Sequence, residues 1–195
     1  MWLKFTLFGA LLTLALHVFV LILNGQDPIA TPISQLSRNT LGELHTLGLI
    51  VFGLSHITLA IALSGLDRGR LWPIARGLLV SSGIGLMYVA YYFATVPDDT
   101  LFAPNANDPL WIVASLTGAA MGTLQPGFSR LSHRLGLFGA ICLGMWLWLV
   151  PVILFVTDSW LGAYERIVGT VYVVWVAGIA LHLIISRKSP ETASR

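Results

Sequence analysis

The feature that most constrains this chain is a series of long runs of apolar residues that contain almost no charge. As helices, these runs would be apolar on all sides. Each run is about 20 residues long, the length at which an α-helix crosses roughly 30 Å of hydrocarbon. A transmembrane barrel would instead show segments of about ten residues with alternating polarity. Charged residues make up 10% of the chain, against about 25% in soluble domains. We therefore expect an all-α polytopic membrane protein.

The apolar runs predict a compact bundle of six transmembrane helices. They cover residues 2–23, 42–63, 73–95, 109–125, 137–157 and 167–185. We expect a single domain over residues 1–186 and a short cytoplasmic tail over residues 187–195. Small residues four apart, such as Gly77, Ser81 and Gly85, favour close helix packing. The two halves of the chain show a weak sequence similarity, which leaves open an inverted repeat of three helices each.

The basic residues predict how the chain is oriented in the membrane. With a cytoplasmic N-terminus, nine of the eleven Lys and Arg residues fall in cytoplasmic segments, and only Arg38 and Arg166 fall outside. Cytoplasmic segments of membrane proteins are the ones enriched in Lys and Arg. Both termini are therefore predicted to be cytoplasmic, and the protein is expected to be multi-pass in the plasma (inner) membrane. Most acidic residues then fall on the outer face.

Polar residues at the outer face supply the candidate ligand-binding residues. They are Ser34, Ser37, Glu43, His45, Asp98 and Asp99. The two serines belong to a connector over residues 24–41, whose prolines and turn-forming residues suit a loop that caps the bundle. Hydroxyl donors followed by Arg38 suit a lipid phosphate or a carboxylate. Binding of a lipid head group or small solute is the leading hypothesis, and the connector is expected beside the loop over residues 97–108.

A membrane-embedded hydrolase is one alternative function. Serine, histidine and aspartate in one layer supply a nucleophile, a base and an orienting acid. His45 is the one histidine in that layer, which does not support a three-histidine zinc site. The catalytic residues stay unknown, and the sequence leans away from an enzyme without excluding one.

A small proton- or cation-coupled transporter is the other alternative, and it would use His56. This residue follows His45 by three helical turns, so the two share a helix face. A histidine in the middle of a span is costly unless it finds a polar partner. We expect His56 to face the bundle interior, with Ser81, Ser82 or Tyr88 as its partner.

The sequence suggests no cofactor and no metal site. It has no phosphate-cradling glycine loop, cysteine-pair metal site or redox pair. Haem ligation by two histidines needs ligands at matching depths, and only His17 is placed even approximately for His45. The expected partners are membrane lipids and a small solute or lipid head group, with no nucleic acid. The oligomeric state stays open.

Three short motifs are distributed along the chain. They are residues 32–37 (Pro-Ile-Ser-Gln-Leu-Ser), residues 96–99 (Val-Pro-Asp-Asp) and residues 164–166 (Tyr-Glu-Arg), the last followed by Trp175 and His182. With these motifs the chain resembles bacterial membrane proteins grouped as domain of unknown function 998, over nearly its whole length. The resemblance implies a membrane protein of about six helices without an assigned activity. The chain departs from it in having Asn105, Asn107 and Asp108 where a histidine is expected.

Overall fold

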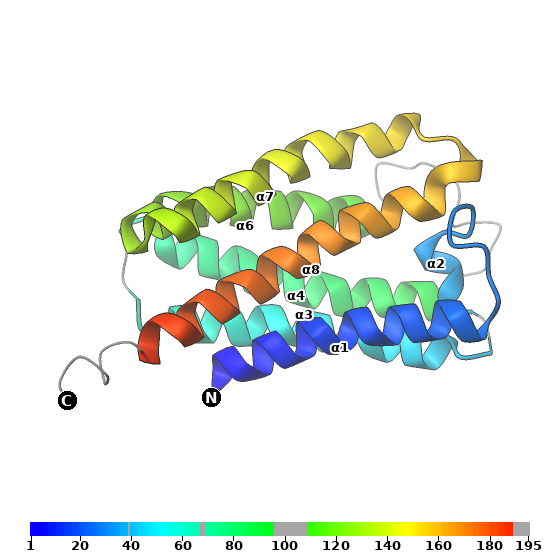
Figure 1. Ribbon diagram of the computed structural model, residues 1–195, viewed down its shortest axis with the longest axis horizontal. Coiled ribbons are helices and arrows are strands. Elements are labelled where there is room, and N and C mark those ends of the chain that lie inside the picture. The colour runs from blue at the N-terminus through cyan, green and yellow to red at the C-terminus, as the bar shows by residue number, and fades with distance from the viewer. Residues whose placement is uncertain (39, 67–68, 96–108, 189–195) are drawn as a thin grey trace.

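The computed structural model describes residues 1–38, 40–66, 69–95 and 109–188, and these residues form a bundle of helices (Figure 1). The elements are α1 (Trp2–Leu23), α2 (Ile33–Leu36), α3 (Gly42–Leu63), α4 (Trp72–Thr95), α6 (Pro109–Leu131), α7 (His133–Val152), the 3-10 helix η1 (Ile153–Phe155) and α8 (Asp158–Lys188). No strand occurs in these residues. The predicted all-α fold is confirmed.

Five of the helices are long and apolar enough to cross a membrane, namely α1, α3, α4, α7 together with η1, and α8. The remaining long helix, α6, packs between α4 and α7. Its second half contains Thr123, Gln125 and Arg130, which makes it less apolar than its neighbours. The chain is thus a multi-pass membrane protein whose sixth long helix completes the bundle.

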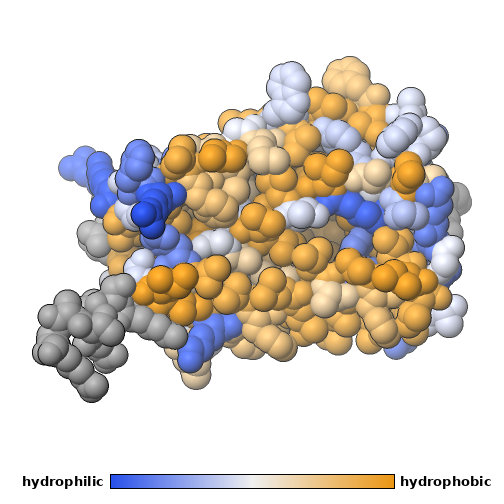
Figure 2. All heavy atoms as spheres, viewed as in Figure 1, coloured by the Kyte–Doolittle hydropathy of each residue, from blue (hydrophilic) through white to orange (hydrophobic). Residues whose placement is uncertain are grey.

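The long helices run up and down along a common axis, as Figure 1 shows. The start of α1 and the end of α8 lie at one end of the bundle, which we call the terminal end. The short helix α2 lies at the opposite end, which we call the connector end. Figure 2 shows apolar surface along the bundle with hydrophilic residues gathered at its two ends. This distribution matches what a protein surrounded by lipid requires.

Helix α8 differs most from the sequence prediction, because it begins at Asp158 and not near residue 167. Hydropathy detects only the lipid-embedded part of a helix, whereas the preceding polar residues are helical too. Its 31 residues correspond to roughly 46 Å at 1.5 Å per residue, more than the hydrocarbon thickness. Glu165 and Arg166, expected in an outer loop, therefore lie about two turns inside the helix.

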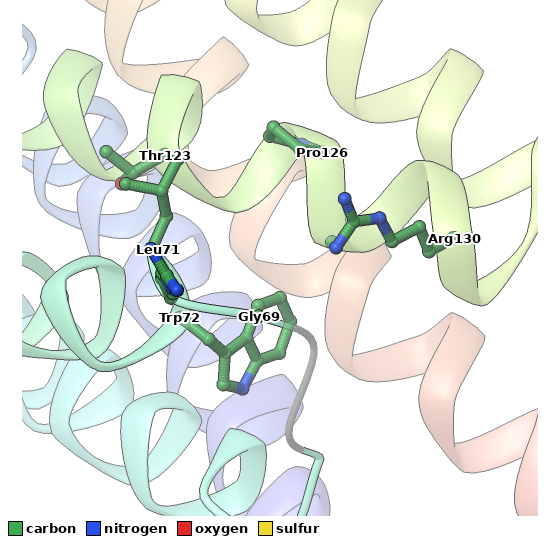
Figure 3. Close-up of a pocket in the computed structure, with 8 residues that line it drawn as sticks. Gly69, Leu71, Trp72, Thr123, Pro126 and Arg130 are labelled. Carbon is green, nitrogen blue, oxygen red and sulfur yellow. The ribbon is translucent and has the colours of Figure 1, made fainter.

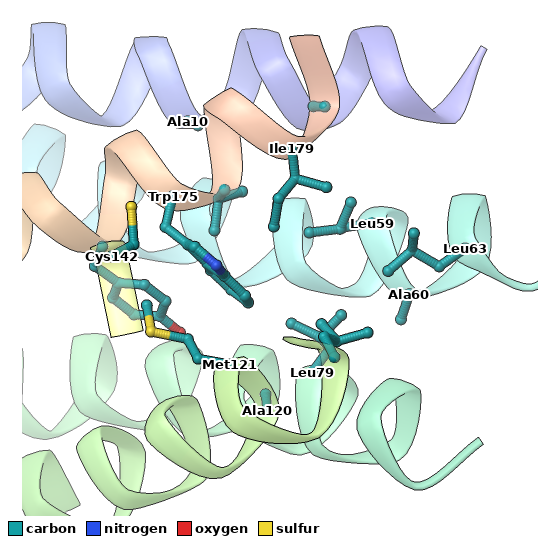
Figure 4. Close-up of a cluster of buried hydrophobic side chains, with 14 of the residues drawn as sticks. Ala10, Leu59, Ala60, Leu63, Leu79, Ala120, Met121, Cys142, Trp175 and Ile179 are labelled. Atoms are coloured by element: carbon teal, nitrogen blue, oxygen red, sulfur yellow. The ribbon is translucent and has the colours of Figure 1, made fainter. Parts of the chain in front are cut away.

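The core forms where α3, α4, α6 and α8 meet. Trp175 and Ile179 project from α8 toward Leu59 of α3 and Met121 of α6 (Figure 4). All four side chains are almost completely buried. Because lipid is as apolar as these side chains, close packing contributes more here than removal from water does.

Polar groups bridge α1 and α3 at several levels. The hydroxyls of Thr6 and Thr58 lie 2.9 Å apart, and Thr13 Oγ1 donates to the carbonyl of Gly48 at 2.8 Å. Interhelical bonds of this kind are a normal source of helix association in membranes. They hold the two helices in a register that brings a histidine of each together at the connector end.

Candidate functional site

The connector, residues 24–41, packs against the first turns of α8. The backbone N–H of Ala163 donates to the carbonyl of Ile29 at 2.9 Å. The Oε2 atom of Glu165 accepts the backbone N–H of Ile33 at 2.5 Å. The connector is therefore fixed to α8 by direct bonds from both backbone and side chain.

Arg166 provides the third attachment. Its Nη1 atom donates to the carbonyl oxygens of Pro28 at 2.9 Å and Thr31 at 2.8 Å. The opposite edge of the guanidinium, Nε and Nη2, is buried and has no hydrogen-bond partner in the described part of the chain. Arginine uses such an edge to bind a carboxylate or phosphate through two parallel bonds. A buried donor without a partner costs about 1–3 kcal/mol, and more when charged.

Two histidines lie close to this guanidinium. The rings of His17 on α1 and His45 on α3 are 5.4 Å apart, and the charge of Arg166 acts on both. The Nε2 atom of His17 is buried without a partner among the described residues. The Nδ1 atom of His45 bonds to Ser37 Oγ at 2.8 Å. Residues from α1, α3, α8 and the connector thus form one cluster.

Buried polar atoms without a partner concentrate around this cluster. Over the described residues there are eight such side-chain atoms, and six belong to the connector end: His17 Nε2, Asn24 Nδ2, Gln26 Oε1, Thr46 Oγ1, and Arg166 Nε and Nη2. Protein interiors leave few such groups unpaired. Figure 2 shows hydrophilic surface interrupting the apolar face between α8 and α1, on the side of α2. The connector end therefore holds most of the buried polar atoms that lack a partner in the described part of the chain.

The structure brings together only some of the candidate ligand-binding residues that the sequence places at the outer face. Ser37 and His45 are in the cluster, while Ser34 is buried on α2 and Glu43 is exposed in the first turn of α3. Asp98, Asp99 and the rest of the loop over residues 97–108 lie outside the described residues, as do Asn105, Asn107 and Asp108. Among the described residues, the connector bonds to α8, to α3 through Ser37 and His45, and to α4, where Arg38 Nε donates to the carbonyl of Phe93 at 3.0 Å.

Sequence reasoning did not propose His17 or Arg166 for this site. His17 was considered only as a partner of His45 for haem, and Arg166 was placed in an outer loop. One signal for Arg166 was present, because only two of the eleven basic residues fall at the outer face. A basic residue is unusual at the outer face, and this one belongs to the Tyr-Glu-Arg motif.

His56 is fully buried in the bundle interior, but the predicted partners are wrong. Its Nδ1 atom bonds to the carbonyl of Phe52 at 2.8 Å, so the Nδ1 atom carries the proton, because a carbonyl only accepts. Its ring packs against Phe52 at 4.7 Å and Tyr172 at 4.8 Å. Ser81 is exposed, and so is Tyr88. The acceptor that His56 uses, the carbonyl of Phe52, lies on its own helix α3 and not on α4, where the predicted partners lie.

Ser82, the third predicted partner, belongs to a ring of three hydroxyl groups. Its Oγ lies 2.8 Å from Thr117 Oγ1 and 2.7 Å from the Tyr172 hydroxyl, and Thr117 donates to Tyr172 at 2.7 Å. Each hydroxyl can donate once and accept once around the ring. The ring satisfies three buried polar groups and links α4, α6 and α8.

Replacing Tyr172 with phenylalanine should destabilise the protein by about 1–2 kcal/mol, because one member of this buried ring is lost. Ser82 and Thr117 can still bond to each other, which limits the loss. Thermal unfolding in detergent measures the effect. Tyr88→Phe is the matched control, since Tyr88 is 55% exposed. Equal melting temperatures for the two variants would contradict a structural role for the ring.

Comparison with known proteins identifies the family of the chain. The family described as protein of unknown function (DUF998) matches residues 7–182. No curated protein and no solved structure matches the chain. Among the described residues, no group of three or more His, Cys, Asp or Glu side chains is placed to hold a metal ion.

Proposed function

Because the chain belongs to the DUF998 family of proteins of unknown function, we propose a function from the site itself: binding of an anionic group at the connector end. The anion is the phosphate or carboxylate of a lipid head group or small solute. The observation that carries the proposal is the buried, unpartnered Nε and Nη2 edge of Arg166. Two parallel donors at a fixed spacing fit two oxygen atoms of one anion.

The carboxylates of Glu165 and Asp27 act on Arg166, but neither accepts a bond from its Nε and Nη2 edge, which leaves that edge to an anion. The positive charge of Arg166 acts on both His17 and His45, so a cation beside these rings would be repelled. Glu165, the adjacent carboxylate, accepts the N–H of Ile33 in the connector. His17 Nε2 is buried beside the cluster without a partner among the described residues, and as a donor it supplies a third bond to the anion.

The depth of the site suits a head group. Arg166 lies eight residues after the start of α8, which is roughly 12 Å along a helix that exceeds the hydrocarbon thickness. The hydrophilic surface between α8 and α1 faces sideways (Figure 2). A lipid arriving from the membrane and a solute arriving from water both have access to such a position.

Titration of the purified full-length protein in detergent tests the proposal. The probes are inorganic phosphate, acetate and dihexanoyl phosphatidylglycerol, followed by calorimetry. We expect Arg166→Lys to weaken binding at least about tenfold, or 1.4 kcal/mol, because lysine keeps the charge but lacks the two-donor edge. Binding of phosphatidylglycerol alone identifies a head group, and equal binding of phosphate or acetate identifies a solute.

The matched control is Glu165→Gln, which removes a negative charge next to the site. Glutamine keeps an oxygen that accepts the N–H of Ile33, so the connector stays attached. Affinity in this variant should equal or exceed that of the wild type. Unchanged affinity in Arg166→Lys would contradict anion binding at this edge.

One observation also supports the hydrolase alternative. The 2.8 Å contact between Ser37 Oγ and His45 Nδ1 is the separation of a hydroxyl nucleophile and its base. In ester hydrolysis, Ser37 Oγ would bond to the acyl carbon while its proton passes to His45, which returns it to the leaving alcohol. Water then hydrolyses the acyl-serine, and the positive charge of Arg166, which acts on His45, would stabilise the developing oxyanion.

If the dyad is catalytic, Ser37→Ala should lower ester turnover at least about a hundredfold, since an alanine cannot form the acyl intermediate. Anion binding to Arg166 should persist. Ser34→Ala, in the other buried serine of this segment, is the control and should keep wild-type turnover. Hydrolysis of a fluorogenic short-chain ester is the assay, and wild-type turnover in Ser37→Ala would rule out this role.

The transporter alternative would need a polar path from His45 to His56, roughly 16 Å along α3. The buried ring of Phe52 packs against His56 at 4.7 Å. The carbonyl of Gly48 is already bonded to Thr13. These contacts favour a site at the connector end over a path through the bundle.

A further inference from the structure

A second polar region lies at the terminal end, away from the connector. A pocket of about 390 Å³ opens between the segment that leads into α4 and the second half of α6. Figure 3 shows Trp72 and Arg130 on opposite sides of it, with Thr123 and Pro126 along α6. Because α8 and the connector do not contribute to its lining, this pocket is independent of the connector-end site.

The wall of the pocket is rigid. Trp72 is 3% exposed, and its Nε1 atom donates to the carbonyl of Leu63 at 2.9 Å. Its ring meets Phe128 edge-on at 6.0 Å. Because this indole is held at both its polar and apolar sides, it fixes the segment that leads into α4 and so keeps that wall of the pocket in place.

The mouth of the pocket is cationic. Arg70 and Arg130 are both exposed lining residues, and no described lining residue is acidic. Gly69, at φ 110°, adopts a backbone conformation that L side chains rarely reach. This turn presents Arg70 beside the pocket and brings the Gly69 backbone close to Arg130 Nη1.

We propose that this pocket binds the phosphate of an anionic lipid head group. Two guanidinium groups at one mouth attract an anion, and arginine matches the geometry of phosphate oxygens. The pocket is at the basic end of the bundle, where Lys4, Arg76, Arg134 and Arg187 also lie. Basic clusters beside membrane helices attract anionic lipids. Leu71, which is 48% exposed, then contacts the glycerol and upper acyl region.

Native mass spectrometry of the full-length protein tests this site. The protein is released from micelles that contain phosphatidylglycerol or phosphatidylcholine, and the retained lipid is counted. All variants carry Arg166→Lys, which removes the two-donor edge at the connector end. We expect Arg70→Gln to lower retained phosphatidylglycerol about tenfold. Arg70 is exposed, so the substitution should not affect folding.

Arg134→Gln is the matched control, because it removes one exposed charge near the same end without lining the pocket. It should retain phosphatidylglycerol as the parent does. Equal losses in both variants would show attraction to net charge alone and overturn the proposal. Competition by inorganic phosphate at the same concentration as phosphatidylglycerol would also overturn it, since the pocket would then take free phosphate and not a lipid.

Discussion

Replacing Arg166 with glutamine should loosen the connector at residues 28–31 and strongly weaken anion binding at the connector end, while the bonds from Ala163 to Ile29 and from Ile33 to Glu165 remain. The variant loses the two bonds from Nη1 to the carbonyls of Pro28 and Thr31, together with the free Nε and Nη2 edge. Hydrogen bonds from a charged donor contribute about 1.5–3 kcal/mol each. The two bonds to the anion therefore correspond to an affinity loss of at least about a hundredfold.

Hydrogen exchange resolved along residues 24–41 measures the loosening of the connector. Lysine can still donate to one of the two carbonyls. Exchange of the connector's backbone amides should therefore be faster in Arg166→Gln than in Arg166→Lys. The Glu165→Gln control should exchange at close to the wild-type rate. A connector equally protected in Arg166→Gln and wild type would show that Arg166 does not hold it.

Replacing Gly53 with valine should destabilise the bundle by about 3 kcal/mol. Gly53 lies where α3 crosses α4, and a Cβ atom there would be 2.5 Å from the carbonyl oxygen of Gly83. The clash is with backbone, so no side chain can rotate to relieve it. The two helices would have to separate, and membrane helices depend on such close approach.

Thermal unfolding in detergent compares this variant with Gly77→Val on α4. A Cβ atom at Gly77 would have no neighbouring atom within 4 Å, so valine there changes helix propensity but displaces nothing. Only Gly53→Val should show a large fall in melting temperature. Similar melting temperatures for the two variants would contradict a tight crossing of α3 and α4.

The helices that lie wholly within an apolar run could be predicted closely from the sequence. The predicted spans 2–23 and 42–63 match α1 and α3, because polar turn residues end the apolar run at each connector boundary. The span predicted over residues 109–125 was too short, since α6 continues past Pro126 to Leu131. An apolar run ends where the residues no longer contact lipid. The helix can continue beyond that point, because its backbone hydrogen bonds do not depend on lipid contact.

The candidate site could be predicted only in part, because its contacts join distant segments. Ser37 and His45 are eight residues apart, and their pairing follows from the fold of one short connector. His17 and Arg166 come from opposite ends of the chain. Their proximity depends on the packing of α1 against α8, which no local pattern encodes. For the same reason the sequence predicted that His56 is buried but not which group it contacts.

The most direct test of the anion site follows the Nε–H resonance of Arg166 by nuclear magnetic resonance in protein labelled with ¹⁵N-arginine. Its absence in Arg166→Lys assigns the signal. We expect the resonance to shift during titration with dihexanoyl phosphatidylglycerol or inorganic phosphate, because the Nε–H group gains an acceptor. A resonance that stays unchanged while the probe is shown to bind the protein would contradict the proposed site.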